Sequence, residues 1–197
     1  MGTKIVNLRG TSGSGKSTVA FTFLKNFPSA ELRGSDGKVK GYVVDANSAG
    51  LTAPVYILGK YTTACGGCDQ IPTQQEAADR AVSAYKSGGH VLMEGLLASA
   101  AGPGGAVTKT ISDTGDAVFA ILDTPLQTCI ERVLARRAAR GDERPFNPKN
   151  TNDKWTQTMS TAKTLHGLGY DVRPIDHTKA YEDVLAIFKE AEGAGND

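Results

Sequence analysis

A glycine-rich segment near the start of the chain carries residue types that bind the phosphates of a nucleotide. Residues 10–17 read GTSGSGKS and match the pattern G-x-x-x-x-G-K-[ST] at every fixed position. The glycines allow successive backbone N–H groups to turn toward phosphate oxygens, and the following helix N-terminus adds a favourable dipole. A serine-glycine surface turn is the alternative interpretation. We predict a nucleotide site made of Gly10, Thr11, Ser12, Gly13, Ser14, Gly15, Lys16, Ser17 and Thr18.

Three side chains in and near this segment are suited to phosphoryl transfer. Lys16 is expected to reach the β- and γ-phosphates of ATP, and the Ser17 hydroxyl is expected to bind magnesium. Glu94 ends the apolar run 91–93, which places its carboxylate at the end of a predicted core strand. There it could bind the metal or accept a substrate proton, or it could make a structural hydrogen bond. We predict ATP and Mg²⁺ as cofactors, with Ser17 and Glu94 as metal-binding residues.

An arginine-rich helix is predicted at about 125–140. Arg132, Arg136 and Arg140 recur every four residues and therefore share one helical face, opposite an apolar stripe. In a small kinase such a helix, followed by the loop 141–150, forms a lid whose arginines neutralise charge on the transferring phosphoryl group. A solvated helix face, with nearby acids pairing the arginines, is the alternative. We predict a lid at approximately 130–150, with Arg136 and Arg140 as its catalytic arginines.

The segment CGGCD at 65–69 allows three interpretations. Cys65 and Cys68 could contribute to a zinc site, which needs about four ligands, or could form a redox pair. The interpretation we favour is a tight loop whose glycines allow close approach to a substrate and whose Asp69 is a general base. Transfer to an alcohol requires such a carboxylate to accept the hydroxyl proton. Asp45, at the end of another predicted strand, is the rival base.

A further polar segment, NPKNT at 147–151, follows the arginine-rich helix. Its side-chain amides could contact the edge of a nucleotide base, but capping of the loop explains them equally well. Both interpretations stay open at this point.

The elements that position these residues alternate between strands and helices. Apolar runs predict strands at 3–9, 38–45, 53–60, 90–97, 117–122 and 170–175. Helical spacing and capping signals predict helices from 16 to before Pro28, after Thr73, and near 125–140, 152–166 and 179–192. This pattern indicates a three-layer α/β P-loop kinase fold with a mostly parallel five-stranded sheet. The runs 38–45 and 53–60 suggest a small β-hairpin excursion, and residues 1–197 are expected to form a single domain.

Composition excludes several classes of protein. The 197 residues carry a net charge of +1, so no global basic field indicates nucleic-acid binding, although a local basic channel remains compatible with this value. Three cysteines favour a reducing compartment over a disulfide framework. No apolar run approaches the roughly 20 residues that span a membrane. We expect a soluble cytoplasmic protein with no membrane contact.

Several segments together resemble the bacteriophage 5-hydroxymethyluracil DNA kinases, which are P-loop enzymes of thymine hypermodification. The similar segments, in the expected order, are NLRGTSGSGKST, YTTACGGCDQI, VLMEGLL and LDTPLQTCIERVLARRAARG with the following NPKNT. The resemblance implies ATP-dependent phosphorylation of the hydroxymethyl group of 5-hydroxymethyluracil in phage DNA, giving 5-phosphomethyluracil in the host cytoplasm. It also implies ATP-site roles for Gly13, Lys16 and Ser17.

A DNA substrate requires contacts to phosphates and exposure of the target base. The lid arginines together with Lys149, Lys154 and Lys163 could supply those contacts, or could bind only ATP. Two other functions stay open: a kinase of free nucleotides or nucleosides, and a non-catalytic nucleotide-binding switch. Clustered arginines and the acids Asp69 and Glu94 argue against a switch, because a protein that only binds nucleotide needs no transfer machinery.

Overall fold

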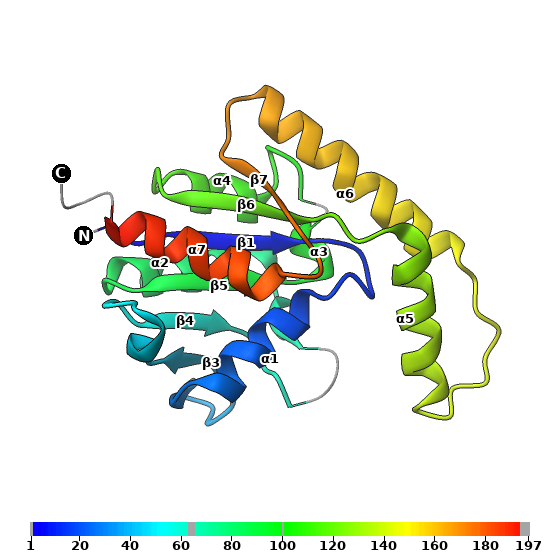
Figure 1. The fold of residues 1–197 in the computed structure, drawn as a ribbon, viewed down its shortest axis with the longest axis horizontal. Coiled ribbons are helices and arrows are strands. Elements are labelled where there is room, and N and C mark those ends of the chain that lie inside the picture. Colours follow the sequence, from blue (N-terminus) through cyan, green and yellow to red (C-terminus); the bar gives the residue numbers. More distant parts are fainter. Residues whose placement is uncertain (1, 63–65, 100, 194–197) are drawn as a thin grey trace.

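The strands lie side by side in one sheet, and a strand near its centre leads into the glycine-rich segment. The computed structural model describes residues 2–62, 66–99 and 101–193, and within these ranges the sheet has seven strands in the order β2-β3-β4-β5-β1-β6-β7 (Figure 1). The strands are β1 (Ile5–Arg9), β2 (Ser29–Arg33), β3 (Val39–Val44), β4 (Val55–Leu58), β5 (His90–Glu94), β6 (Ala117–Leu122) and β7 (Val172–Ile175).

Five neighbouring strands, from β4 to β7 across the sheet, run parallel to one another. The remaining strands, β2 and β3, add an antiparallel edge, and β3 pairs antiparallel with β4. Parallel pairing brings the carboxyl ends of the five strands to one edge of the sheet, where their loops meet. The predicted mostly parallel sheet and the predicted pairing of 38–45 with 53–60 are therefore confirmed. Five strands were expected in the sheet, but within the described ranges it has seven, because β2 and β3 belong to the same sheet and form its antiparallel edge.

Helices cover both faces of the sheet. Helices α1 and α7 pack on one face, and α2, α4 and the end of α6 pack on the other (Figure 1). Within the described ranges, no helix combines the length and apolar character that a membrane crossing requires. The helices are α1 (Lys16–Asn26), α2 (Gln74–Lys86), α3 (Leu96–Ser99), α4 (Ala106–Ser112), α5 (Leu126–Ala138), α6 (Lys149–Gly167) and α7 (Ala180–Gly193), with 3-10 turns η1 (Asn47–Ala49) and η2 (Gly67–Gln70).

The central strands are buried on both faces because their side chains alternate between the two helical layers. Val6 and Leu8 of β1 pack in the cluster formed with α1 and α7, whereas Ile5 packs in the cluster formed with α2 and α4. All three side chains are fully buried. Strands buried on both faces have continuous apolar runs, which explains why the sequence pattern identifies them without period-2 alternation.

Three elements differ from the sequence-based expectation in the first half and middle of the chain. Strand β2 was not predicted, because its residues SAELR are largely exposed and show no apolar pattern. The strand predicted at 90–97 ends at Glu94, and residues 96–99 form the short helix α3. Helix α4 follows the glycine-rich segment 102–105 and was also missed.

The arginine-rich region also has different helix limits. Helix α5 ends at Ala138, so Arg140 lies beyond it in the following turn. Helix α6 begins at Lys149, so residues 149 and 150, expected in the loop, are helical. Pro148 lies just before this helix, a region where a residue without an N–H group costs no intrahelical hydrogen bond. The Asn147 side chain accepts a hydrogen bond from the Lys149 N–H at 2.9 Å, which supports the capping interpretation for this residue.

The buried residue His90 of β5 hydrogen-bonds both the segment before β1 and the last helix, α7. The Lys4 N–H donates to His90 Nδ1 at 3.2 Å, so His90 Nε2 carries the proton and donates to Glu192 at 3.1 Å. Glu192 also accepts the backbone N–H groups of Thr52 and Ala53, each at 2.8 Å. Burial raises the pKa of Glu192, but these N–H donors together hold it below its ordinary value. Burial lowers the pKa of His90 below 6.5, more than Glu192 raises it.

The His90 network predicts that acid destabilises the fold. The unfolded chain binds a proton at His90 more readily than the folded chain, so the free energy of unfolding should fall as the pH drops below about 6.5. We expect His90→Gln to lose much of this pH dependence between pH 7 and pH 5, and to lower stability at pH 7.5 by about 1–3 kcal/mol. Urea denaturation at several pH values measures both quantities.

His166→Gln is the matched control, because His166 is an exposed histidine of α6. In this variant the free energy of unfolding should depend on pH as it does in the unmodified protein. The same pH dependence in His90→Gln would contradict the proposed neutral, buried state of His90.

Candidate active site at the phosphate-binding loop

The glycine-rich segment forms a loop between β1 and α1 at the carboxyl edge of the sheet. Gly13 and Gly15 have positive φ angles of 81° and 104°, a backbone region that glycine adopts without strain. A side chain on Gly13 would also collide with the carbonyl of Cys129 in α5. Both glycines are thus required by the backbone path, and α1 begins at Lys16 directly after Gly15.

Lys16, Ser17 and Glu94 meet at the base of this loop. The Lys16 ammonium donates to the carbonyls of Gly10 and Thr11 at 2.8 and 3.0 Å, and the side chain is buried. The Ser17 hydroxyl donates to Glu94 at 2.9 Å, and Glu94 is only 2% exposed. Burial lowers the pKa of Lys16 and raises that of Glu94, and each charge opposes the shift of the other.

The Ser17–Glu94 pair has the donor chemistry that magnesium prefers. Both groups offer oxygen atoms, and they already lie within hydrogen-bond distance of one another beside the phosphate-binding loop. The chemistry of these two residues therefore fits the predicted ion, which Ser17 and Glu94 would hold.

The 3-10 turn η2 brings Asp69 to the cavity that Lys16, Ser17 and Glu94 also line. A side chain on Gly67 would collide with Glu94, so this glycine makes room for the acid and not for a substrate. Gly66 does line the cavity, together with Asp69. Asp69 is exposed and its carboxylate lies close to Gly95, the residue after Glu94. Two acids, one buried and one exposed, thus border one space.

The cysteines play a more limited part. Cys65 lies outside the described residues, so the predicted pairing with Cys68 has no structural description. Cys68 is a buried free cysteine, and burial raises the pKa of its thiol. Among the described residues, Cys68 belongs to no group of three side chains that could hold a metal ion.

Helix α5 lies beyond the carboxyl ends of the strands, next to the loop after β1 (Figure 1). Arg132 and Arg136 line the cavity with the phosphate-binding loop, and the Arg132 guanidinium donates to the Gly13 carbonyl at 3.4 Å. Arg140 is not among the residues that line this cavity. Arg132 lies in the middle of α5 and contacts the phosphate-binding loop. Helical spacing alone does not distinguish this role from that of Arg136.

Helix α6 holds the loop from a second side. The Thr11 hydroxyl donates to the Thr151 carbonyl at 3.1 Å. Trp155 donates its indole N–H to the Thr124 carbonyl at 3.1 Å, and the Thr124 hydroxyl donates to the Ser14 carbonyl at 2.8 Å. The loop is therefore fixed by contacts with residues more than 100 positions away.

The whole arrangement encloses a cavity of about 690 Å³. It extends from the phosphate-binding loop to the start of α7, where His177, Thr178 and Tyr181 line it. This wall was not predicted, because His177 carried no motif in the sequence. Asp45, the rival base, lies at the end of β3 and lines a different cavity, where it accepts the Asn47 N–H at 3.0 Å.

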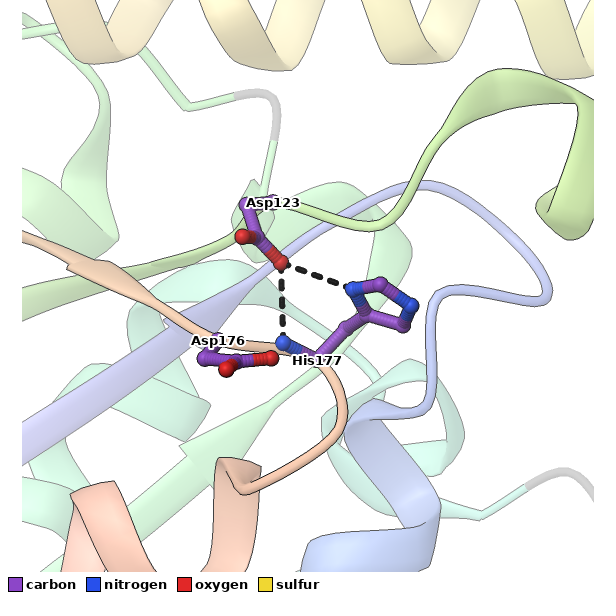
Figure 2. Close-up of side chains that lie close together, drawn as sticks. All are labelled: Asp123, Asp176 and His177. Atoms are coloured by element: carbon purple, nitrogen blue, oxygen red, sulfur yellow. Dashed lines mark hydrogen bonds and ion pairs between the residues drawn. The ribbon is translucent and has the colours of Figure 1, made fainter.

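Asp123, Asp176 and His177 form a cluster at the ends of β6 and β7, shown in Figure 2. Asp123 accepts both the backbone N–H and the Nδ1 group of His177, at 2.8 and 2.9 Å. Asp176 accepts the backbone N–H and the hydroxyl of Thr178 at 2.8 and 2.7 Å. These contacts fix the turn between β7 and α7 and so hold the far wall of the cavity in place.

Comparisons of the sequence and of the structure with known proteins gave the following results. No protein-family model matches the chain. A deoxyadenosine kinase from M. mycoides with bound dCTP is structurally similar, with a TM-score of 0.48 and 11% identity over 94% of this chain and 99% of that one. A 5-hmdU DNA kinase of Pseudomonas phage M6 is 29% identical, over 94% of this chain and 98% of the relative.

A second curated relative is closer in sequence. The 5-hmdU DNA kinase of Pseudomonas phage PaMx11 is 36% identical, and the alignment covers 94% of this chain and 97% of the relative. This similarity extends over nearly the full length of both proteins, which confirms the resemblance inferred from the sequence segments. The chain belongs to the family of 5-hmdU DNA kinases.

Proposed function

We propose that the protein transfers the γ-phosphoryl group of ATP to the hydroxymethyl oxygen of 5-hydroxymethyluracil in DNA, giving 5-phosphomethyluracil and ADP. The observation that carries the proposal is the cavity in which Lys16, Glu94 and Asp69 border one space beside two arginines. Membership of a family whose members are named 5-hmdU DNA kinases supports the choice of acceptor. The proposed working unit is one kinase domain over 1–197, with a lid at approximately 130–150, in the cytoplasm.

In this mechanism each residue has a distinct task. Backbone N–H groups of the loop and the Lys16 ammonium bind the phosphates of ATP, with Gly10 to Thr18 as the nucleotide site. Ser17 and Glu94 would hold a magnesium ion, which would supply positive charge to offset part of the phosphate charge. Asp69 accepts the hydroxyl proton while the hydroxymethyl oxygen forms its bond to phosphorus and the bond to the ADP oxygen breaks.

The arginines complete the site. Arg136 lines the cavity and neutralises charge on the phosphoryl group during transfer. Arg132 anchors the loop carbonyls. Arg140, which follows the end of α5, reaches the phosphates only if residues after Ala138 move toward the cavity.

The division of roles between the two acids favours Asp69 as the base. Glu94 is buried and its carboxylate already accepts the Ser17 hydroxyl. Asp69 lines the cavity and is exposed, so an incoming hydroxyl group can approach it. The position of Asp45 argues against it as the base, since it lines another cavity.

An acceptor assay tests the proposed function. γ-labelled ATP and magnesium are incubated with hydroxymethyluracil-containing DNA, thymine DNA, or free hydroxymethyl-deoxyuridine monophosphate. We expect label only in the modified DNA, and a loss of about 100-fold to 1,000-fold in Lys16→Ala. Lys25→Ala, an exposed lysine at the end of α1, should retain full activity.

Other outcomes of this assay identify other functions. Label on the free nucleotide alone would show a metabolite kinase. ATP binding with no labelled acceptor would show a nucleotide-binding switch.

Substitution of the two acids separates base catalysis from metal binding. Asp69→Asn should lower kcat by about 100-fold to 10,000-fold and leave the magnesium concentration for half-maximal rate unchanged. Glu94→Gln should instead raise that magnesium concentration, because one of the two proposed protein ligands is weakened. Asp45→Asn is the control and should behave like the unmodified protein. A magnesium shift in Asp69→Asn, with none in Glu94→Gln, would reverse the assignment.

The two candidate lid arginines can be ranked by kinetics. Arg136→Ala should lower kcat by about 10-fold to 100-fold, because the removed charge lies in the cavity. Arg140→Ala should have the smaller effect, since that residue contributes only after movement of the lid. Steady-state rates at saturating ATP and DNA measure both. A larger loss in Arg140→Ala would show that the catalytic conformation differs substantially from the one described.

A further inference from the structure

A second cavity, of about 540 Å³, lies beside the loop that carries Asp69, and the mechanism above leaves it without a role. The antiparallel edge of the sheet, the segment after β4, the end of η2 and the middle of α2 form its walls. Five cationic side chains line it, and we call them the basic groove: Arg33, Lys38, Lys40, Lys60 and Arg80.

The basic groove retains positive charge after its internal ion pairs are considered. Glu31 pairs with Arg33, Asp36 contacts Lys40 at 3.1 Å and Lys38 at 3.9 Å, and Glu76 pairs with Arg80. Five cations therefore face three carboxylates, an excess of two. Lys60 is exposed, and none of the ion pairs found among the described residues involves it. The Lys38 side chain is 79% exposed, so its charge is also available to a partner.

The groove begins one residue away from the proposed base. Asp69 and Gln70 are consecutive in η2, yet Asp69 lines the cavity of the phosphate-binding loop and Gln70 lines the basic groove. Gly59, at the start of the groove, packs so closely on Gly67 that a side chain would collide with it. Gly67 in turn packs on Glu94. A single turn of backbone thus separates the two cavities.

We propose that the basic groove binds the phosphodiester backbone of the DNA strand whose modified base enters the cavity of the phosphate-binding loop. The identity of that base rests on the proposed function, whereas the backbone contact rests on the groove. A chain of phosphates offers repeated single negative charges, which suits a row of lysines and arginines. Backbone bound along η2 leaves the attached base free to point toward Asp69.

The lining of the groove favours contacts with phosphates over contacts with bases. Among the described residues that line it, none is aromatic, so it has no surface on which bases could stack. Among the described residues, the apolar side chains that line the groove are those of Val39, Ile71 and Pro72. Binding of this kind depends on charge and is insensitive to the base sequence of the DNA.

The lysines of α6 are a less suitable surface. Lys149 and Lys163 are separated by about 21 Å along the helix at 1.5 Å per residue, and Lys154 already hydrogen-bonds Gln157. Helix α6 also lies on the opposite side of β1 from the β2–β3 edge (Figure 1). Neither Lys154 nor Lys163 lines the catalytic cavity.

Charge reversal on the two surfaces tests the proposal. Lys38→Glu combined with Lys60→Glu alters the groove, and Lys154→Glu combined with Lys163→Glu is the control with the same change in net charge. Binding of a fluorescein-labelled hydroxymethyluracil oligonucleotide is measured by anisotropy without ATP, over a range of NaCl concentrations. The groove variant should bind at least about 10-fold more weakly, with a shallower dependence of log Kd on log salt by about one unit per lost phosphate contact.

The control variant should bind like the unmodified protein, and both variants should keep the thermal melting temperature and the affinity for a fluorescent ATP analogue. Equal weakening in the two variants, or an unchanged salt dependence in the groove variant, would overturn the proposal. Because binding is measured without phosphoryl transfer, these results are independent of the acceptor assay. Where that assay does detect DNA phosphorylation, an unchanged KM for DNA in the groove variant would also overturn it.

Discussion

Two buried opposite charges, on Lys16 and Glu94, determine how the centre of the structure is built. Either charge would be costly to bury alone, so each requires a counter-charge or a bound ion nearby. Parallel pairing places Glu94 of β5 beside Leu8 of β1, two residues before the phosphate-binding loop, and α1 then begins with Lys16. The adjacency of β1 and β5 therefore brings both charges to one point.

The same loop is fixed from the other side by the helices that carry the arginines. Gly13 packs on the Cys129 carbonyl, and Ser14 accepts a hydrogen bond from Thr124, just before α5. The first turns of α5 thus pack against the phosphate-binding loop and hold Arg132 beside it, with Arg136 one turn further along. Arg140 lies past the last turn of α5. Under the proposed mechanism, closure of the site over substrate would come chiefly from residues after Ala138.

The local sequence pattern was sufficient to predict the phosphate-binding loop, the five parallel strands and the position of Glu94 at the end of a strand. These features depend on short motifs or on runs of buried apolar residues. Strand β2 escaped prediction because an exposed edge strand has no apolar pattern, and its pairing with β3 determines its conformation. The His90–Glu192 contact joins residues 102 positions apart, and no local signal indicates it. The wall at His177 was missed for the same reason, since only the neighbouring ends of β6 and β7 bring that residue to the site.

The net charge of +1 by itself gives little support for a DNA substrate, but net charge is a poor guide to the charge of one local surface. Acidic residues elsewhere on the chain cancel the total without cancelling the local excess in the basic groove. At physiological salt, exposed charges interact over only about 8 Å, so a phosphate in the groove is affected by the lysines and arginines around it and little by distant acids. Under the proposal, Asp69 lies on one side of η2 and the basic groove on the other, so the backbone would be bound by the excess of positive charge while the base is presented to a carboxylate.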